Sequence, residues 1–273
     1  MPQQCAPIQR GLPKGRKLIT TAVILAAGRG TRLGEEFKTK PKGLLEVGGQ
    51  SLISRSLGLL ESVGIDRIVL DTGHCAHHYD TLGMDRPTVE CHLNAEYATS
   101  GSMQTLAGLR DVLDEDFLLL ESDIIYERFA LFSLLERAEC DVVLGSDWTG
   151  SSDEVYIETN AEGLLVDMSK DAASLMSLDA ELVGISKLSI GTYSSMCDAV
   201  ASKCLDEPFL DYEYGLVEAS SAAPIYVHRE EHLAWGEIDD ASHLQRVERD
   251  VMPLINEHDR RTNALLPRRR GKA

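Results

Sequence analysis

The sequence predicts an α/β protein of three layers, in which helices cover a mixed, mostly parallel sheet. Short apolar runs alternate with segments of about a dozen residues that carry apolar positions at helical spacing, which is typical of βαβ units. The 273 residues, 43% of them hydrophobic, are enough for one large core. No internal repeat or linker divides the chain, so a single domain over residues 19–260 is expected.

The first half of the chain alternates regularly between the two element types. "TAVILAA" is apolar without interruption and precedes a glycine loop, which predicts a strand buried on both faces. "SLISRSLGLLESVG" has helical spacing and ends at Gly64, a helix stop. The expected strands are 21–27, 65–73, 88–94, 116–123 and 141–147, and the expected helices are 51–64, 100–113 and 129–139.

The pattern changes from about Trp148 onward. "NAEG" between two short apolar segments predicts a hairpin over 154–169. A strand at 180–189 and a helix at 191–204 follow, and strands at 223–230 and 233–239 are expected to finish the sheet. The last helix, 240–258, begins at Asp240 or Ser242.

Charge and composition argue against a nucleic-acid-binding or membrane-spanning protein. A net charge of −17 argues against nucleic acid as a partner, because the surface repels phosphates. No run approaches 18 apolar residues, so no membrane span is expected. Six scattered cysteines without a C-x-x-C pair are typical of reduced thiols, which favours a cytoplasmic location. Whether the protein forms a homodimer is left open by the sequence.

The two ends of the chain are expected to lie outside the domain. Residues 1–18 contain basic residues and no acid, and the apolar run after them leads into a glycine-rich loop without a small-residue cleavage site. They are therefore interpreted as a mobile leader rather than a secretory signal. Residues 261–273, which end in "RRRGKA", are interpreted as a basic tail.

The loop after the first strand, "GRGTRL", allows three interpretations. As a dinucleotide-binding turn it lacks the third glycine, which is replaced by Leu33, and Asp71 lies about 40 residues beyond it instead of about 20. As a P-loop it lacks the Gly-Lys-Ser/Thr ending. As a polyphosphate loop it has glycines that admit close backbone approach, with Arg32 and Lys42 as cations. The alternative is a tight turn with solvated basic residues.

"LAAGRGTRL" followed by "KPKGLLEVGGQSLISRSL" resembles the nucleotidyltransferase signature of sugar-1-phosphate and related NTP transferases. The similarity continues through "SVGIDRIVLDTG", "LLLESD" and "VGISKLS" and covers roughly residues 20–250. "AWGEIDDASHLQRVE" resembles more narrowly the bacterial 2-aminoethylphosphonate and phosphocholine cytidylyltransferases, in which an E-I-D-[DT] segment follows the last strand. The resemblance implies a Rossmann-like nucleotidyltransferase fold.

Carboxylates at strand ends suggest a metal site. Asp123 closes an apolar strand, at the edge where ligands of open α/β sheets bind, although a lone Asp there is more often a turn former or cap. Glu237 and Asp239 share one side of a strand, and Asp240 or Ser242 can cap the next helix in their place. Carboxylates together with phosphate oxygens suit Mg²⁺. The resemblance implies Asp123 and Asp239 as ligands, with Glu237 sharing the site; Ser122 stands where the family often has Gly or Ala.

The resemblance also implies the nucleotide site. Arg32, Lys42, Asp123 and Asp239 form the expected catalytic set. "NAEYATSGSMQTL" resembles the segment that reads the base, and it also suits a strand end followed by a helix cap. The expected nucleotide-binding residues are Leu25, Ala26, Ala27, Gly28, Gly30, Thr31, Arg32, Lys42, Asn94, Ser100, Gly101, Ser102 and Asp123.

The acceptor site is expected late in the chain. Aromatic faces and carboxylates hold ammonium groups, so Tyr212, Glu213 and Trp235 are candidates for the acceptor's amine. Lys170 is a candidate for the acceptor's phosphonate or the α-phosphate, and Glu237 for a further acceptor contact; ordinary core and surface roles are the alternative. "HCAHHYD" (74–80) lacks the paired spacing of structural zinc and is interpreted as a solvated loop.

The expected reaction is Mg²⁺-dependent transfer of CMP from CTP to an aminoalkyl phosphonate or phosphate, with 2-aminoethylphosphonate favoured and pyrophosphate released. Phosphocholine or sugar-1-phosphate acceptors, and a catalytically silent nucleotide-binding domain, remain alternatives.

Overall fold

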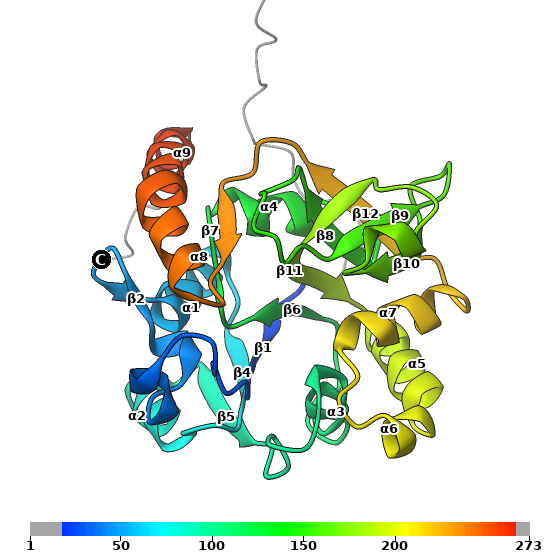
Figure 1. Cartoon of the computed structure of the whole chain (residues 1–273), viewed down its shortest axis with the longest axis horizontal. Coiled ribbons are helices and arrows are strands. Elements are labelled where there is room, and N and C mark those ends of the chain that lie inside the picture. Colours follow the sequence, from blue (N-terminus) through cyan, green and yellow to red (C-terminus); the bar gives the residue numbers. More distant parts are fainter. Residues whose placement is uncertain (1–17, 266–273) are drawn as a thin grey trace, which may run out of the picture.

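The computed structural model describes residues 18–265. The expected leader, apart from Leu18, and residues 266–273 of the expected tail lie outside the described residues. Within this range the main sheet and two short strand pairs alternate with helices along the chain (Figure 1).

The strands of the main sheet are β1 (Thr21–Ala26), β4 (Arg67–Thr72), β5 (Val89–Leu93), β6 (Phe117–Glu121), β8 (Val142–Ser146), β9 (Tyr156–Thr159), β10 (Leu165–Ser169), β11 (Ala180–Leu188) and β12 (Tyr226–Glu230). Their order is β10-β9-β11-β6-β1-β4-β5, with β8 beside β11 and β12 beside β8. The β6-β1-β4-β5 block is parallel, whereas β11 runs antiparallel to β6. The predicted mixed sheet is confirmed.

The short pairs are β2 (Glu46–Val47) with β3 (Gln50–Ser51) and β7 (Ile124–Tyr126) with β13 (Trp235–Glu237). The helices are α1 (Leu52–Val63), α2 (His77–Asp85), α3 (Ser102–Ala107), α4 (Phe129–Leu135), α5 (Ile190–Val200), α6 (Lys203–Asp206), α7 (Tyr212–Ser220), α8 (Ala241–Arg246) and α9 (Met252–Leu265).

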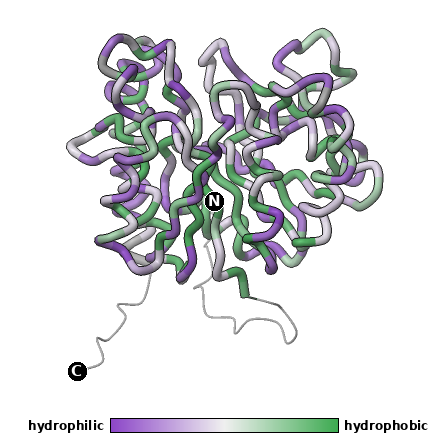
Figure 2. The backbone as a smooth tube through the Cα atoms, turned by 90° about the horizontal axis from the view of Figure 1, so that it is seen from below, coloured by the Kyte–Doolittle hydropathy of each residue, from purple (hydrophilic) through white to green (hydrophobic). Residues whose placement is uncertain are grey.

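Helices cover both faces of the main sheet, which gives the three expected layers. Alternate residues of β1 point to opposite sides. Ile24 joins a buried cluster with residues of α1, α2 and α4, and Val23 joins a cluster with residues of α3, α5 and α7. Figure 2 shows hydrophobic stretches of chain concentrated along the middle of the molecule.

Local signals account for where two of the helices begin or end. The Ser51 hydroxyl accepts a hydrogen bond from the Ser54 amide at the start of α1, and Gly64 ends that helix with a φ of 101°. The Asp240 side chain accepts from the amides of Ser242 and His243 and so caps α8. These predictions of helix boundaries are confirmed.

Other helix predictions need correction. Residues 77–85, partly expected as loop, form α2, and α7 occupies a segment without a predicted helix. The helix expected over 100–113 ends at Ala107, before Gly108, a residue of low helix propensity. The last helix contains a π turn at Val247–Val251, just before Pro253, which has no N–H to donate. It then continues to Leu265, beyond the expected end of the domain.

The strand expected at 233–239 does not finish the main sheet. β13 pairs antiparallel with β7 instead. Its neighbours Ala234 and Ile238 are buried in a small third core with Val247 and Ile255 of the C-terminal helical segment. Because β13 is flanked by residues that pack on the C-terminal helical segment, it lies outside the main sheet, and Glu237 pairs with Ile124 of β7.

Two further expectations concern the whole chain. No described helix is both long and apolar enough to cross a membrane. Cys75, Cys91, Cys140, Cys197 and Cys204 are all free thiols in the described part of the chain.

Asp71, in β4, gives a prediction about stability. Its side chain is fully buried, neither carboxylate oxygen has a hydrogen-bond partner among the described residues, and His92 Nδ1 lies 3.6 Å from Oδ1. Burial raises the pKa of Asp71 from 3.8 to about 8. Between these two values the folded protein keeps a proton that the unfolded chain releases, so stability falls as the pH rises.

We expect Asp71→Asn to remove this loss of stability at high pH. The melting temperature should rise by about 5 °C or more at pH 8.5 and change little near pH 4. Thermal unfolding followed by circular dichroism across this range measures it. Asp66→Asn, at an exposed position just before the same strand, is the matched control. Parallel pH profiles for Asp71→Asn and the unmodified protein would contradict the prediction.

Candidate active site

A cavity of about 280 Å³ opens at the carboxyl ends of the parallel strands. Leu25 of β1 pairs with Glu121 of β6, so the loops after these strands start at the same edge. The residues that line the cavity include Leu25, Ala26, Ala27, Gly28, Lys42, Ser100, Gly101, Ser102, Glu121, Asp123, Lys170, Tyr212, Glu213 and Glu237. Most of the expected site residues therefore come together at one place, as the rule for open α/β sheets predicts.

The glycine loop leads from β1 into this cavity. Gly30 has a φ of +57°, a conformation that favours glycine, and a Cβ there would lie 3.3 Å from Lys42 Cβ. Leu33, at the position where a dinucleotide turn needs glycine, packs against the third core beside Phe37. Gly28 lines the cavity, whereas Gly30, Thr31 and Arg32, which follow it closely in the chain, are not among the lining residues.

Lys42 is the buried cation of the site. Its side chain is 8% exposed, and Nζ donates hydrogen bonds to Asp123 Oδ2 at 2.5 Å and to Asp239 Oδ1. Burial opposes its charge, but the charges of Asp123, Asp239 and Glu237 outweigh burial and raise the pKa of Lys42 above its ordinary value. Lys42 therefore stays an ammonium between two carboxylates.

Arg32 and Lys170 extend this ionic network along the rim. Arg32 donates to Asp239 Oδ2 at 2.8 Å and to Asp153 Oδ2 at 3.0 Å, and its side chain is 59% exposed. Lys170 donates to Asp153 Oδ1 at 3.2 Å. The cations are held by carboxylates, and the exposure of Arg32 leaves its guanidinium accessible to an anion from solvent.

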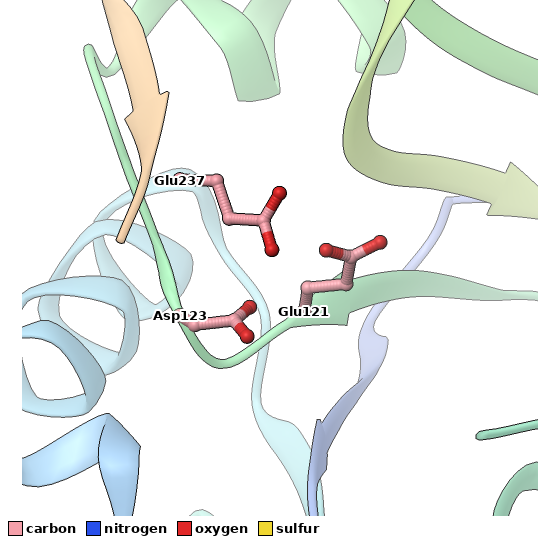
Figure 3. A group of neighbouring side chains, drawn as sticks. All are labelled: Glu121, Asp123 and Glu237. Atoms are coloured by element: carbon pink, nitrogen blue, oxygen red, sulfur yellow. The ribbon is translucent and has the colours of Figure 1, made fainter. Parts of the chain in front are cut away.

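Three carboxylates meet beside Lys42. One oxygen from each of Glu121, Asp123 and Glu237 lies within 4.8 Å of the others, and no other group of this kind occurs among the side chains that the structure describes. Figure 3 shows these side chains converging from β6, from the turn after it and from β13. Their hard oxygen donors fit a cation such as Mg²⁺.

The electrostatics of this group also fit a cation. Burial, followed by the charge of Asp123, raises the pKa of Glu121 to about 7. Burial, with the charges of Asp123, Glu121 and Asp239, raises that of Glu237 to about 10. Carboxylates that repel each other in this way are stabilised when a divalent cation binds between them.

Glu121 is absent from the site predicted from sequence. It precedes Asp123 by two residues at a strand end, and alternation along the strand was the signal that could have found it. Tyr212 donates to Glu121 Oε1 at 2.6 Å, and a Cβ at Gly184 would lie 2.8 Å from Glu121 Cδ. Asp239, expected among the metal ligands, instead lies against Lys42 and Arg32 and outside this group.

The segment expected to bind the nucleotide base, residues 94–102, also makes hydrogen bonds within the protein. Asn94 donates to Ser100 Oγ at 3.0 Å and is not among the residues that line the cavity. The Gly101 amide donates to Pro208 O at 2.7 Å, and the Ser102 hydroxyl accepts from the Tyr212 amide at 2.9 Å. Ser100, Gly101 and Ser102 thus line the cavity, and Gly101 and Ser102 also hold the segment at the start of α7.

The expected acceptor residues separate into two groups. Lys170, Tyr212, Glu213 and Glu237 line the main cavity. Trp235 is 5% exposed, and its indole N–H donates to Ser146 Oγ at 2.8 Å, so it is largely a core residue that borders only a smaller side cavity.

The histidine run packs on the segment that leads to Lys42. His74 Nε2 lies 3.0 Å from Phe37 O, and His78 Nε2 lies 2.9 Å from Thr39 O. No histidine belongs to the carboxylate group described above. The run therefore fixes the path of residues 37–39, which a solvated loop would not do.

The model of the MobA-like NTP transferase domain family matches residues 22–187, more than half of the chain. The chain is similar to the CMP-5′-(3-aminopropyl)phosphonate synthase of Streptomyces rubellomurinus, with 32% identity over 153 residues. This match covers 55% of the chain but only 24% of that relative. The 2-aminoethylphosphonate cytidylyltransferase of Lancefieldella rimae is 26% identical over 171 residues, which cover 62% of the chain and 67% of the relative.

Solved structures show the same fold. The CTP:phosphocholine cytidylyltransferase from Streptococcus pneumoniae superposes with a TM-score of 0.71 at 20% identity, covering 84% of this chain and 98% of that one. The inositol-1-phosphate CTP transferase from T. maritima has a TM-score of 0.75 at 18% identity, with coverage of 88% and 98%. The predicted Rossmann-like fold is confirmed.

Proposed function

Because the chain belongs to the family of MobA-like NTP transferase domains, we propose that it is a cytidylyltransferase that joins CTP to an aminoalkyl phosphonate or phosphate and releases pyrophosphate. The observation that carries this proposal is that one cavity brings Gly28 of the glycine loop and Lys42 together with Glu121, Asp123 and Glu237. 2-Aminoethylphosphonate is the favoured acceptor, giving CMP-2-aminoethylphosphonate, because two relatives are named for aminoalkyl phosphonates.

In the proposed reaction an acceptor oxygen attacks the α-phosphorus of CTP in line. A new P–O–P bond forms, the bond from the α-phosphorus to the bridging oxygen breaks, and the electron pair leaves with pyrophosphate. The acceptor oxygen is already ionised at neutral pH, so no general base is required. Catalysis then rests on positioning and on neutralisation of charge.

Each side of the cavity has a role in this proposal. The backbone of Gly28–Thr31, with Lys42 and Arg32, holds the triphosphate and neutralises the leaving pyrophosphate. Cations close to the triphosphate are needed because the chain carries a net charge of −17, which by itself repels an anionic nucleotide. Asp123, Glu237 and Glu121 would hold Mg²⁺, with Asp239 beside them, and the bound ion would supply further neutralisation of phosphate charge.

The nucleotide base is assigned to Ser100, Gly101 and Ser102, which line the same cavity as Lys42 and carry backbone and hydroxyl groups for hydrogen bonds. The choice of CTP rests on the names of the relatives.

A matrix of reactions tests the proposal. Four nucleoside triphosphates are combined with 2-aminoethylphosphonate, phosphocholine, phosphoethanolamine and hexose 1-phosphates, and pyrophosphate is measured with and without Mg²⁺. The expected result is release only with CTP, Mg²⁺ and an aminoalkyl acceptor. Release with phosphocholine or a hexose 1-phosphate would assign one of those activities instead. Nucleotide binding without release from any acceptor would indicate a silent nucleotide-binding domain.

Glu121 gives a specific prediction within this proposal. Glu121→Gln removes one charged oxygen donor and keeps the shape of the side chain. We expect the Mg²⁺ concentration for half-maximal pyrophosphate release to rise about tenfold or more. A Mg²⁺ titration of activity measures this shift, and Glu162→Gln, exposed in the turn between β9 and β10, serves as control. An unchanged Mg²⁺ requirement would exclude Glu121 from the metal site.

A further inference from the structure

A small side cavity of about 50 Å³ adjoins the main cavity. The two cavities share Glu121, Lys170, Glu213 and Glu237 as lining residues. The side cavity continues past this shared wall toward the start of β11, where Glu181 lines it. A ligand whose phosphorus end lies beside Lys170 and the carboxylates can therefore extend its other end into the side cavity.

The walls of the side cavity are rich in hydrogen-bond acceptors. Glu181 is 2% exposed, and its two oxygens accept from the amide and hydroxyl of Thr149, at 2.6 and 2.8 Å, which fixes this carboxylate. Glu213 Oε2 is buried and has no hydrogen-bond partner among the residues that the structure describes. A buried carboxylate oxygen without a donor is costly, so this oxygen points to a ligand that carries N–H groups.

The side cavity does not have the walls of an aromatic cage. Trp235 is the single aromatic residue among its described lining residues, and it lies in the core with its N–H bonded to Ser146. Quaternary ammonium groups are held by several aromatic faces. They also have no N–H to donate, so a trimethylammonium group here would leave the Glu213 oxygen unpaired.

The volume admits such a group. A cavity needs about 10–15 Å³ of such volume to hold one water molecule, so about 50 Å³ accommodates an ammonium group.

We propose that the side cavity binds the primary ammonium group of the acceptor, with Glu213 as its hydrogen-bond acceptor, and that it thereby selects primary amines against quaternary ones. This inference rests on the proposed function and names the acceptor class: aminoalkyl phosphonates or phosphates with a free amine. Lys170, on the shared wall, contacts the anionic end of the same acceptor. Glu213 acts as a specificity-determining residue for acceptor binding.

The test compares 2-aminoethylphosphonate with its N-methyl, N,N-dimethyl and N,N,N-trimethyl derivatives. We expect kcat/KM to fall with each methyl group, by about 100-fold over the series, because each methyl replaces a donor. Calorimetry measures binding of the same compounds beside a non-reactive CTP analogue. Glu213→Gln should lower kcat/KM for 2-aminoethylphosphonate and flatten the series.

Glu218→Gln is the matched control, because Glu218 lies on the same helix and contacts Tyr214 and Lys203 instead of the cavity. Equal use of the primary and trimethylated acceptors by the unmodified protein would overturn the inference and leave cytidyl transfer intact. Preferential binding of the primary amine without pyrophosphate release from any acceptor would overturn the proposed function and leave the ammonium site intact. Equal binding of all four compounds without release would overturn both.

Discussion

Asp123→Asn is expected to lower pyrophosphate release from CTP by about a thousandfold. Asp123 stands where two parts of the site meet, since its carboxylate accepts a hydrogen bond from Lys42 and also belongs to the group with Glu121 and Glu237. The amide is similar in shape but has no charge for a cation. The loss should therefore appear in kcat as well as in the Mg²⁺ requirement.

Steady-state kinetics at saturating Mg²⁺ measure this loss, and circular dichroism verifies that the variant is folded. Asp114→Asn provides the matched control, because this side chain lies just before β6 and is 88% exposed. Full activity in Asp123→Asn would refute the role of Asp123 in catalysis.

Lys42→Met is expected to have the second large effect, on both activity and stability. Removal of the ammonium leaves Asp123 and Asp239 without their shared buried partner, which typically costs about 3–5 kcal/mol of folding free energy. Activity should fall by about 10²- to 10³-fold, because the leaving phosphates lose a fixed cation.

A divalent cation should distinguish this variant from a simple packing defect. Mg²⁺ bound by Asp123, Glu121 and Glu237 would supply positive charge where the ammonium is missing, so it should raise the melting temperature of Lys42→Met more than that of the unmodified protein. Thermal unfolding with and without Mg²⁺ measures the difference. Lys38→Met, at an exposed lysine four residues earlier that pairs with Glu35, is the control. A Lys42→Met variant that is as stable as its parent without Mg²⁺ would show that the ammonium does not neutralise the pair.

Much of the architecture could be predicted, because it depends on short-range patterns. Continuous apolar runs identified the central strands, and Gly64 and Asp240 marked helix ends through backbone conformation and capping. The pairing of β13 could not be predicted in this way. A three-residue strand pairs according to what its neighbours are buried against, and the helical segment that covers Ala234 and Ile238 follows later in the chain.

Some residues of the candidate site could likewise be predicted from sequence patterns, and others could not. Asp123 and Glu237 were expected to lie near each other from their places at strand ends, and the structure brings them together. Glu121 follows from alternation along its strand. Trp235, expected to face an amine, is mostly in the core, because residue type alone does not reveal how much of a ring is covered.

The alternation of strands and helices, the glycine at position 30 and the charges near one edge of the sheet could be predicted from residue types and their order. The folded structure was needed to place Lys42, and no other described lysine, between Asp123 and Asp239, and to bring Glu121 beside Asp123 and Glu237. Periodicity assigns a side chain to a face, whereas contact between residues about 200 positions apart depends on strand register and on the path of the intervening loops.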